Sequence, residues 1–162
     1  MKAGVDLEAA HEIAANVPDP ELPFLTLTDL GILRSVELQN DTVVAHVSPT
    51  YSGCPALDVI EQSVVEALEQ AGFKARIERV MSPPWTTDWI TDDGKKKLEA
   101  MGIAPPQESH TDKTAFFASP VINCPNCKSN KTKKISEFGS TPCKAQYQCN
   151  SCSEPFEYFK CH

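Results

Sequence analysis

Apolar residues recur at helical spacing in three segments of the chain. Positions three and four residues apart predict a helix over Asp6–Val17, where Asp6 can cap the first turn. The same pattern predicts a longer helix over Pro55–Ala71, which begins at a proline, and a short one over residues 91–102. The residues expected to face the core are Leu7, Ala10, Ala14 and Val17, then Leu57, Ile60, Val64 and Leu68, and finally Leu98 and Met101.

Alternating apolar and polar residues predict three strands. Two of them, Ile32–Leu38 and Thr42–Ser48, form a predicted hairpin about Gln39-Asn40-Asp41, and residues 73–78 form the third. The order helix, two strands, helix, strand, helix predicts a compact α/β unit, in which helices pack on a small three-stranded sheet.

A change in composition divides the chain. Residues 104–120 have mixed polarity, three prolines and no clear period, which is typical of a linker. We therefore predict an α/β domain at 1–106, a linker at 107–120 and a smaller β module at 121–162. The 162 residues are enough for a domain of about 100 residues plus such a module.

Four cysteines in the smaller module have the spacing of a zinc ribbon. Cys124 and Cys127 form one Cys-x-x-Cys turn, and Cys149 and Cys152 form a second, with 21 residues between the turns. That separation suits a β-hairpin, and four thiolates complete a closed tetrahedral site. A module with so few apolar residues needs such a staple, so we predict one structural zinc ion. The predicted strands between the two turns are 132–136 and 144–148.

Two other chemistries use the same motif. A redox-active Cys-x-x-Cys normally occurs once, at a helix N-terminus in a βαβ setting, which this part of the sequence does not resemble. A rubredoxin-like site would bind iron with the same four sulfur ligands. Zinc ribbons can bind nucleic acid or proteins, or simply hold a fold together, and the spacing does not choose among these roles.

Charge and hydropathy indicate which partners and which cellular compartment to expect. Residues 1–123 carry 9 Lys/Arg and 19 Asp/Glu, whereas residues 124–162 carry 6 Lys and 3 Glu, so net charges of −10 and +3 make up the total of −7. The acidic body argues against nucleic acid as the chief partner, because phosphate binding needs clustered positive charge. No apolar run approaches the roughly 20 residues of a membrane span, and the N-terminus has no signal-peptide core. We therefore expect a cytoplasmic protein with reduced thiols and no membrane partner.

A single cysteine stands where the longer helix is predicted to begin. In Gly53-Cys54-Pro55 the helix dipole and backbone N–H groups favour a thiolate, and the glycine allows close approach of a ligand. A buried cysteine that fills a small gap is the alternative. Asp19 and Glu21 lie between prolines in a rigid loop, where they can form either an acidic pair for metal or polar contacts or a solvated turn.

Three motifs in the first half of the chain resemble the small α/β domain of iron–sulfur assembly factors, which include bacterial SufT and eukaryotic cytosolic targeting factors. They are Asp19-Pro20-Glu21-Leu22-Pro23, Thr28-Asp29-Leu30-Gly31-Ile32 and Thr50-Tyr51-Ser52-Gly53-Cys54-Pro55. The resemblance implies that Cys54 is a functional thiol at a site for transient iron or an iron–sulfur cluster. Its expected neighbours are Asp19, Glu21 and Thr50.

Further motifs resemble the PaaD family of the phenylacetate degradation pathway, called PaaJ in some naming schemes. They are 82–90 (Ser-Pro-Pro-Trp-Thr-Thr-Asp-Trp-Ile), 102–106 (Gly-Ile-Ala-Pro-Pro), 137–141 (Glu-Phe-Gly-Ser-Thr), Glu154-Pro155-Phe156 and Phe159-Lys160-Cys161. The match covers nearly the whole chain, and the one departure is His162, where an apolar residue is expected. The resemblance implies an accessory protein of the multicomponent phenylacetyl-CoA epoxidase, which has a di-iron oxygenase and a reductase with flavin and a [2Fe–2S] cluster. Such proteins are thought to mature the iron-containing parts and not to catalyse epoxidation.

Three functions fit this sequence. The first is a non-catalytic assembly factor, whose α/β domain handles iron or a cluster transiently and whose ribbon docks a client. Its partners would be the oxygenase and reductase components and iron–sulfur assembly proteins, and a homodimer is compatible with the sequence. The second is a structural adaptor that bridges epoxidase components, and the third is a thiol oxidoreductase acting through Cys54.

Two further cysteines, Cys143 and Cys161, form a candidate secondary thiol pair in the ribbon. If strands 144–148 and 156–160 pair with residue 149 near residue 155, position 143 lies opposite about 161. Both would lie at the end of the ribbon away from the zinc, so neither should ligate it. A second thiol site, a disulfide and two small apolar core fillers all stay open at this point.

Overall fold

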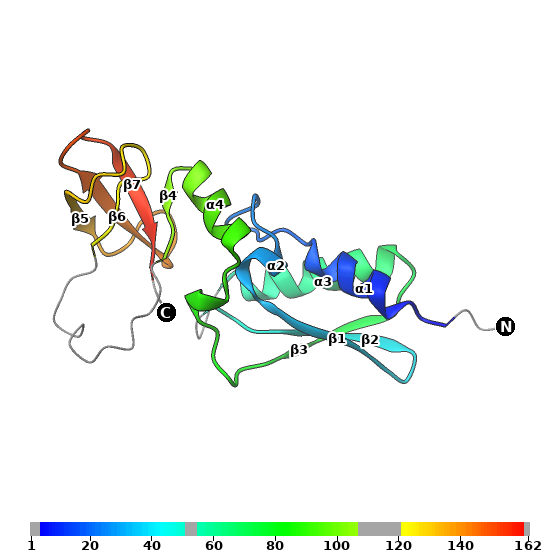
Figure 1. Cartoon of the computed structure of the whole chain (residues 1–162). Helices are drawn as coiled ribbons and strands as arrows, with labels where there is room; N and C mark the ends of the chain where they lie inside the picture. Colours follow the sequence, from blue (N-terminus) through cyan, green and yellow to red (C-terminus); the bar gives the residue numbers. More distant parts are fainter. Residues whose placement is uncertain (1–3, 51–54, 107–120, 161–162) are drawn as a thin grey trace. The chain divides into compact units, whose positions relative to one another are not determined.

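The computed structural model describes residues 4–50, 55–106 and 121–160 of the chain (Figure 1). They form two units, one that ends at Thr91 and one that begins at Asp92, and each is described by itself. Among the described residues, no helix is both long enough and apolar enough to cross a membrane.

The first unit is the predicted α/β fold on a three-stranded sheet. Its strand order is β1-β2-β3, with β1 antiparallel and β3 parallel to the central β2. Helix α3 is the crossover between the two parallel strands, and it lies with α1 over one face of the sheet (Figure 1). The elements are α1 Leu7–Ala15, α2 Leu27–Leu30, β1 Leu33–Gln39, β2 Thr42–Val47, α3 Leu57–Gln70, β3 Ala75–Arg79 and the 3₁₀ turn η1 Thr87–Trp89.

The predicted hairpin between β1 and β2 closes through a two-residue turn. Gln39 pairs with Thr42, and Asn40 and Asp41 between them have φ values of 49° and 64°. Two positive φ angles define the type I′ turn, whose twist matches that of the flanking strands.

The core of this unit lies between α3 and the sheet. All four apolar residues predicted on α3 are buried, each no more than 5% exposed, and they face the helix-covered side of β2. Burying such a side chain contributes about 1.5–3 kcal/mol. The prediction is wrong at Leu7 and Met101, which are 37% and 60% exposed. Both lie at helix ends, where the spacing no longer determines which side faces the core.

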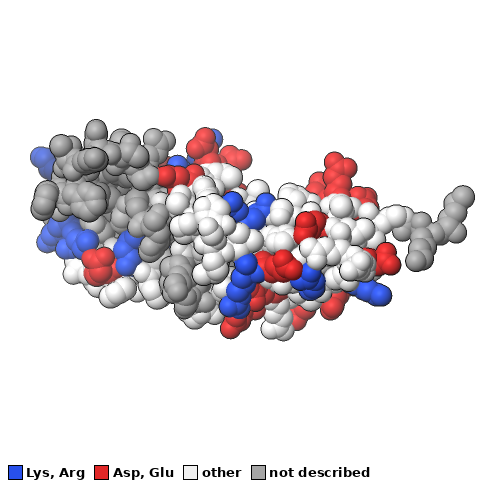
Figure 2. Space-filling model, turned by 90° about the horizontal axis from the view of Figure 1, so that it is seen from below, with Lys and Arg blue, Asp and Glu red and all other residues white. Residues whose placement is uncertain are grey.

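The opposite face of the sheet carries a mixed-charge network. The Nε2 atom of His46 lies 3.0 Å from a Glu37 carboxylate, and its Nδ1 atom lies 3.7 Å from Glu78. Glu78 is also paired with Arg76. In Figure 2 acidic and basic side chains are interspersed over the first unit. This face therefore has no large area of a single sign.

Segment 85–91 packs against the turn that follows α2, an arrangement that the sequence patterns did not predict. The indole Nε1 of Trp85 donates a 2.8 Å hydrogen bond to the Leu30 carbonyl, and Thr91 N–H donates to the Asp29 carbonyl. Gly31 has φ +68°, and a Cβ there would lie 2.5 Å from the Trp89 carbonyl oxygen. A glycine is therefore required where the two segments meet.

The second unit is a four-stranded ribbon preceded by a helix. It contains α4 Asp92–Ala100, β4 Ile103–Ala104, β5 Thr132–Ser136, β6 Lys144–Cys149 and β7 Pro155–Phe159, in the sheet order β4-β7-β6-β5. Ile103 pairs with Glu157, so β4 belongs to the ribbon sheet and not to the α/β domain. The expected domain boundary at 106 therefore differs from the structural boundary at Thr91. The expected linker, 107–120, lies outside the described residues.

The predicted register of β6 and β7 is wrong by one residue. Gln148 pairs with Pro155, and Lys160 N–H donates a 3.0 Å hydrogen bond to the Cys143 carbonyl. Cys143 is thus opposite Lys160 and not Cys161. The prediction paired residue 149 with residue 155, whereas in the structure Gln148 takes that place opposite Pro155. Cys161 itself lies outside the described residues, so the proposed thiol pair stays a prediction.

Candidate functional site

Two knuckles of similar backbone shape carry the four ribbon cysteines. After Cys127 the chain passes through Lys128 at φ +63°, and after Cys152 it passes through Ser153 at φ +65°. In the first knuckle Lys128 N–H donates to the Cys124 carbonyl at 2.9 Å. Each turn reverses the chain within four residues, so that both thiols of a pair point to the same side.

The four sulfur atoms converge on one point. All lie within 4.8 Å of one another, with Cys124–Cys152 at 3.8 Å and Cys127–Cys149 at 3.6 Å. Zinc–thiolate bonds of about 2.3 Å in a tetrahedron require sulfur–sulfur distances of about 3.8 Å. A disulfide requires about 2.05 Å, and none of the described cysteines forms one. The donor set and spacing therefore fit a single tetrahedral thiophilic metal, with no open position for a substrate.

The pKa values of the cysteines also indicate that a bound cation would stabilise the cluster. The pKa of Cys149 is lowered to about 6, chiefly because Cys152 N–H donates to its sulfur, with Ser151 N–H adding to the effect. The Ser129 N–H lowers the pKa of Cys127, but burial and hydrogen bonds with the three other thiols outweigh it and raise that pKa to about 12. Sulfurs this close do not all ionise without a compensating positive charge.

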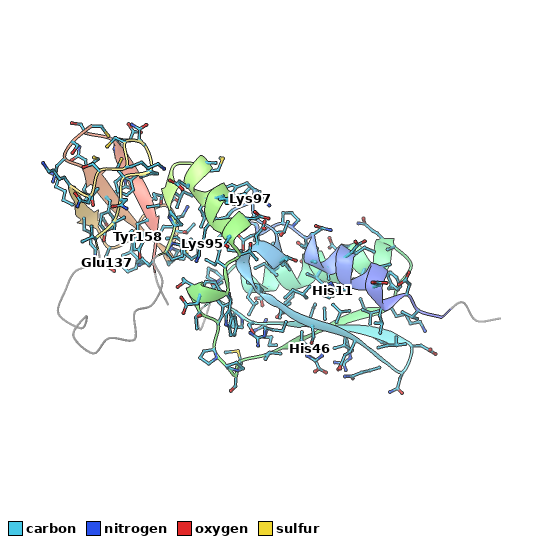
Figure 3. All side chains as sticks on the ribbon, in the orientation of Figure 1. His11, His46, Lys95, Lys97, Glu137 and Tyr158 are labelled. Atoms are coloured by element: carbon cyan, nitrogen blue, oxygen red, sulfur yellow. The ribbon has the colours of Figure 1, made fainter. Side chains whose placement is uncertain are left out.

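A small aromatic core supports the metal-binding end of the ribbon. Buried Cys124 and Cys149 belong to the same apolar cluster as Tyr147, Phe156 and Tyr158. Tyr147 stacks on Phe156 at 5.8 Å between ring centroids and meets Tyr158 edge-on at 5.7 Å. Tyr158 is labelled in Figure 3. Cys143 is buried as well, but it does not belong to the group of four sulfurs.

The acidic loop has a structural role that sequence patterns left open. Asp19 is only 7% exposed, and its Oδ1 accepts 2.8 Å hydrogen bonds from the backbone N–H groups of Glu21 and Leu22. Asp19 N–H in turn donates to the Leu25 carbonyl at 2.9 Å. This carboxylate therefore shapes the loop and is not part of a simple solvated turn.

The loop predicted to hold Cys54 begins from a well-anchored residue. Ser48 is fully buried, and its Oγ donates to the Val80 carbonyl at 2.9 Å, which ties the end of β2 to the end of β3. On the other side of the loop, α3 begins at Leu57 without a side-chain cap. Cys54 lies outside the described residues, so its grouping with Asp19, Glu21 and Thr50 stays a prediction. Sequence reasoning did not identify Ser48, because a lone serine at a strand end carries no signal.

Sequence comparisons cover both units. The family described as "Iron-sulfur cluster assembly protein" matches residues 9–78, and the family described as "PaaD zinc beta ribbon domain" matches residues 108–160. The chain is 46% identical over 155 residues to a protein of Escherichia coli (strain K12) that is named as a putative subunit of 1,2-phenylacetyl-CoA epoxidase. The match covers 93% of this chain and 92% of that one.

A comparison with solved structures supports the fold of the first unit. The crystal structure of a domain of unknown function, DUF59, from Bacillus anthracis matches with a TM-score of 0.52. The match covers 57% of this chain and 90% of that one, at 24% sequence identity. At this identity the likeness shows the fold alone.

Proposed function

We propose that this chain, which belongs to the PaaD family, is a maturation factor for 1,2-phenylacetyl-CoA epoxidase and not a catalytic component of it. The observation that carries the proposal is the iron–sulfur assembly domain over residues 9–78 in a chain whose relative is named as part of the epoxidase. In an epoxidase system, the function that an assembly domain can provide is the supply of iron or a cluster to the iron-containing components.

The two units divide this task. The α/β unit holds iron or an iron–sulfur cluster transiently through Cys54, with Asp19, Glu21 and Thr50 beside it. Buried Ser48 supports this assignment, because its hydrogen bond to the Val80 carbonyl anchors the chain just before the segment. On the other side of the segment α3 begins at Leu57, and the N-terminus of a helix favours a thiolate. Asp19 contributes by shaping its own loop.

The ribbon is the structural and docking part. Cys124, Cys127, Cys149 and Cys152 hold one zinc ion, and the closed four-sulfur geometry supports a structural role. When bound, zinc supplies cross-linking and charge compensation. The clients are the oxygenase or reductase components, with other iron–sulfur assembly proteins as donors.

The variant Cys54→Ala tests the proposal. Epoxidase components produced together with this variant should contain less iron and acid-labile sulfide than components produced with the wild-type chain. Zinc content and the fold of the variant serve as controls, because the zinc ligands lie in the other unit. Full iron and sulfide content with Cys54→Ala would contradict the role assigned to this thiol.

A structural adaptor is the second candidate, and it is favoured by the name of the E. coli relative, which makes that protein a part of the epoxidase itself. An adaptor bridges the components without handling iron. It therefore predicts that Cys54→Ala supports fully active epoxidase, whereas removal of the whole chain abolishes assembly of the complex.

A further inference from the structure

The connection between β5 and β6 exposes an aromatic side chain on the ribbon. Phe138 is 63% exposed, the highest value among the large apolar residues that the structure describes. It lies in the segment Glu137-Phe138-Gly139-Ser140-Thr141, which neither the metal centre nor the iron site uses. Glu137, its neighbour, lies near one end of the ribbon (Figure 3).

Glu157 on β7 holds the segment in place. One oxygen of its carboxylate accepts from Ser140 N–H at 2.7 Å, and both accept from the Ser140 hydroxyl. Lys144, only 4% exposed, lies 3.6 Å from the same carboxylate, and Gly139 N–H donates to the Lys144 carbonyl at 2.7 Å. A Cβ at Gly139 would collide with the Glu157 carboxylate. The backbone on the C-terminal side of Phe138 is therefore fixed.

Lys160 fixes the other side of the aromatic residue. Its ammonium lies 4.5 Å from the centroid of the Phe138 ring and donates to the Glu137 carbonyl at 2.9 Å. Lys134 forms a 2.8 Å ion pair with the Glu137 carboxylate. One face of the ring is thus occupied by a cation while most of the ring stays exposed. A pre-organised aromatic side chain loses little conformational entropy on binding, which is a property of interface hot spots.

The surroundings of Phe138 are basic. Lys134 and Lys160 both lie beside the segment and share the single carboxylate of Glu137, whereas the carboxylate of Glu157 is paired with Lys144, so the segment carries a net positive charge. Residues 124–162 as a whole carry 6 Lys and 3 Glu. A partner surface that complements this charge carries carboxylates.

Strand addition at this edge is disfavoured. β5 is an edge strand, but it carries lysines at 133 and 134 and an irregularity in its pairing between Lys134 and Ser136. Both features protect edge strands from pairing with another chain. A partner of this surface therefore contacts side chains and not the strand backbone.

We propose that Phe138 is the apolar anchor with which the ribbon docks onto a protein partner, at an apolar pocket that is rimmed by carboxylates. The inference rests on the proposed function in one respect, namely that the partner is an epoxidase component. A nucleic acid fits less well, because residues 92–162 contain no arginine. Among the described residues of the ribbon, Phe138 is also the one strongly exposed aromatic side chain, whereas single-stranded nucleic acid is bound by several stacking platforms.

Affinity measurements on the full-length, zinc-loaded chain test the proposal. Phe138→Ala should weaken binding to the purified oxygenase or reductase component by about tenfold or more. Met101→Ala removes a similarly exposed apolar side chain, 60% exposed, from the end of α4, and should change affinity by less than about twofold. Lys134→Glu reverses a charge that contacts the segment, and should slow association and reduce its salt dependence.

Four results would contradict the docking proposal or the proposed function. Equal affinities for wild type and Phe138→Ala, or no binding of either component by the wild type, would overturn the proposal. Tight binding of a single-stranded RNA oligonucleotide that is lost in Phe138→Ala would overturn it in favour of nucleic acid. If Phe138→Ala loses binding but Cys54→Ala leaves the iron and sulfide content of the component unchanged, the docking surface stands and the maturation function fails. Zinc content and circular dichroism of each variant establish that the ribbon is folded.

Discussion

The Sγ atoms of Cys127 and Cys149 lie 3.6 Å apart, although the two residues are 22 positions apart in the chain. The contact is too long for a disulfide and matches the edge of a zinc–thiolate tetrahedron. The ribbon between them is small, and metal binding to such modules provides about 10–16 kcal/mol of apparent free energy. The stability of the ribbon should therefore depend on the ion.

Replacement of one ligand should release the metal. We expect Cys127→Ser to lower the zinc content from one ion per chain towards zero and to abolish the ordered tertiary structure of the ribbon, while the α/β unit stays folded. The measurements are zinc analysis by mass spectrometry and two-dimensional NMR. Cys143→Ser is the matched control, because Cys143 is a buried ribbon cysteine outside the group of four. Loss of zinc in Cys143→Ser as well would show that the ligand set is wrong.

Zinc binding to the ribbon should weaken in acid. In the folded ribbon the backbone N–H groups of Cys152 and Ser151 lower the pKa of Cys149 from 9.0 to about 6, so its thiolate contributes stability that is fully present above pH 9 and is lost as the pH falls from 9 through 6. Because the metal binds the thiolate and not the thiol, zinc release from the loaded chain should increase as the pH is lowered from about 8 to about 5. A chromophoric chelator measures the release. Release that does not change over this pH range would contradict the prediction.

The Lys144–Glu157 pair should contribute to the stability of the ribbon. Glu157→Ala leaves the ammonium of a nearly buried lysine without its carboxylate and removes the acceptor of Ser140, so we expect destabilisation by about 1–3 kcal/mol. Lys134→Ala breaks an exposed pair with Glu137 and should cost less than about 1 kcal/mol. Guanidinium denaturation of zinc-loaded protein, followed by tyrosine fluorescence, measures both. Equal effects of the two variants would contradict the distinction.

Gly31 and Gly72 separate steric conflict from backbone strain. Both have positive φ, +68° and +92°, so an alanine at either costs about 1–2 kcal/mol of strain. Only at Gly31 would the new Cβ also meet the Trp89 backbone, which should add about 1–3 kcal/mol. Thermal unfolding followed by tryptophan fluorescence should therefore place Gly31→Ala clearly below Gly72→Ala. A reversed order would show that segment 85–91 does not pack on this turn.

Local signals explain what the sequence predicted correctly. Each Cys-x-x-Cys turn brings its own two thiols together, so only the meeting of two turns depended on the tertiary fold. The buried face of α3 was predicted correctly because its apolar residues follow the helical period from Leu57 to Leu68. Helix α2 was missed although its signal is present: Thr26 and Asp29 form a capping box, and Gly31 ends the helix in a left-handed conformation.

Long-range pairing explains the errors. β4 has only two residues, Ile103 and Ala104, which is too short for a period, and it pairs in parallel with a strand more than 50 positions away. The register of β6 and β7 depends on the turn that contains Ser153 at φ +65°. A positive φ is not predicted by a serine in the sequence, so the length of this turn could not be derived. The predicted register is therefore off by one residue, and Cys143 lies opposite Lys160 where the prediction had placed Cys161.

The iron and acid-labile sulfide content of the epoxidase reductase component tests the central claim most directly. The component is purified after production with this chain, without it and with the Cys54→Ala variant. The account predicts a full [2Fe–2S] complement only with the wild-type chain, and a reduced complement in the other two preparations at equal flavin content. A reductase that carries its full cluster when made without this chain, together with an oxygenase that carries its full iron, would contradict the maturation function.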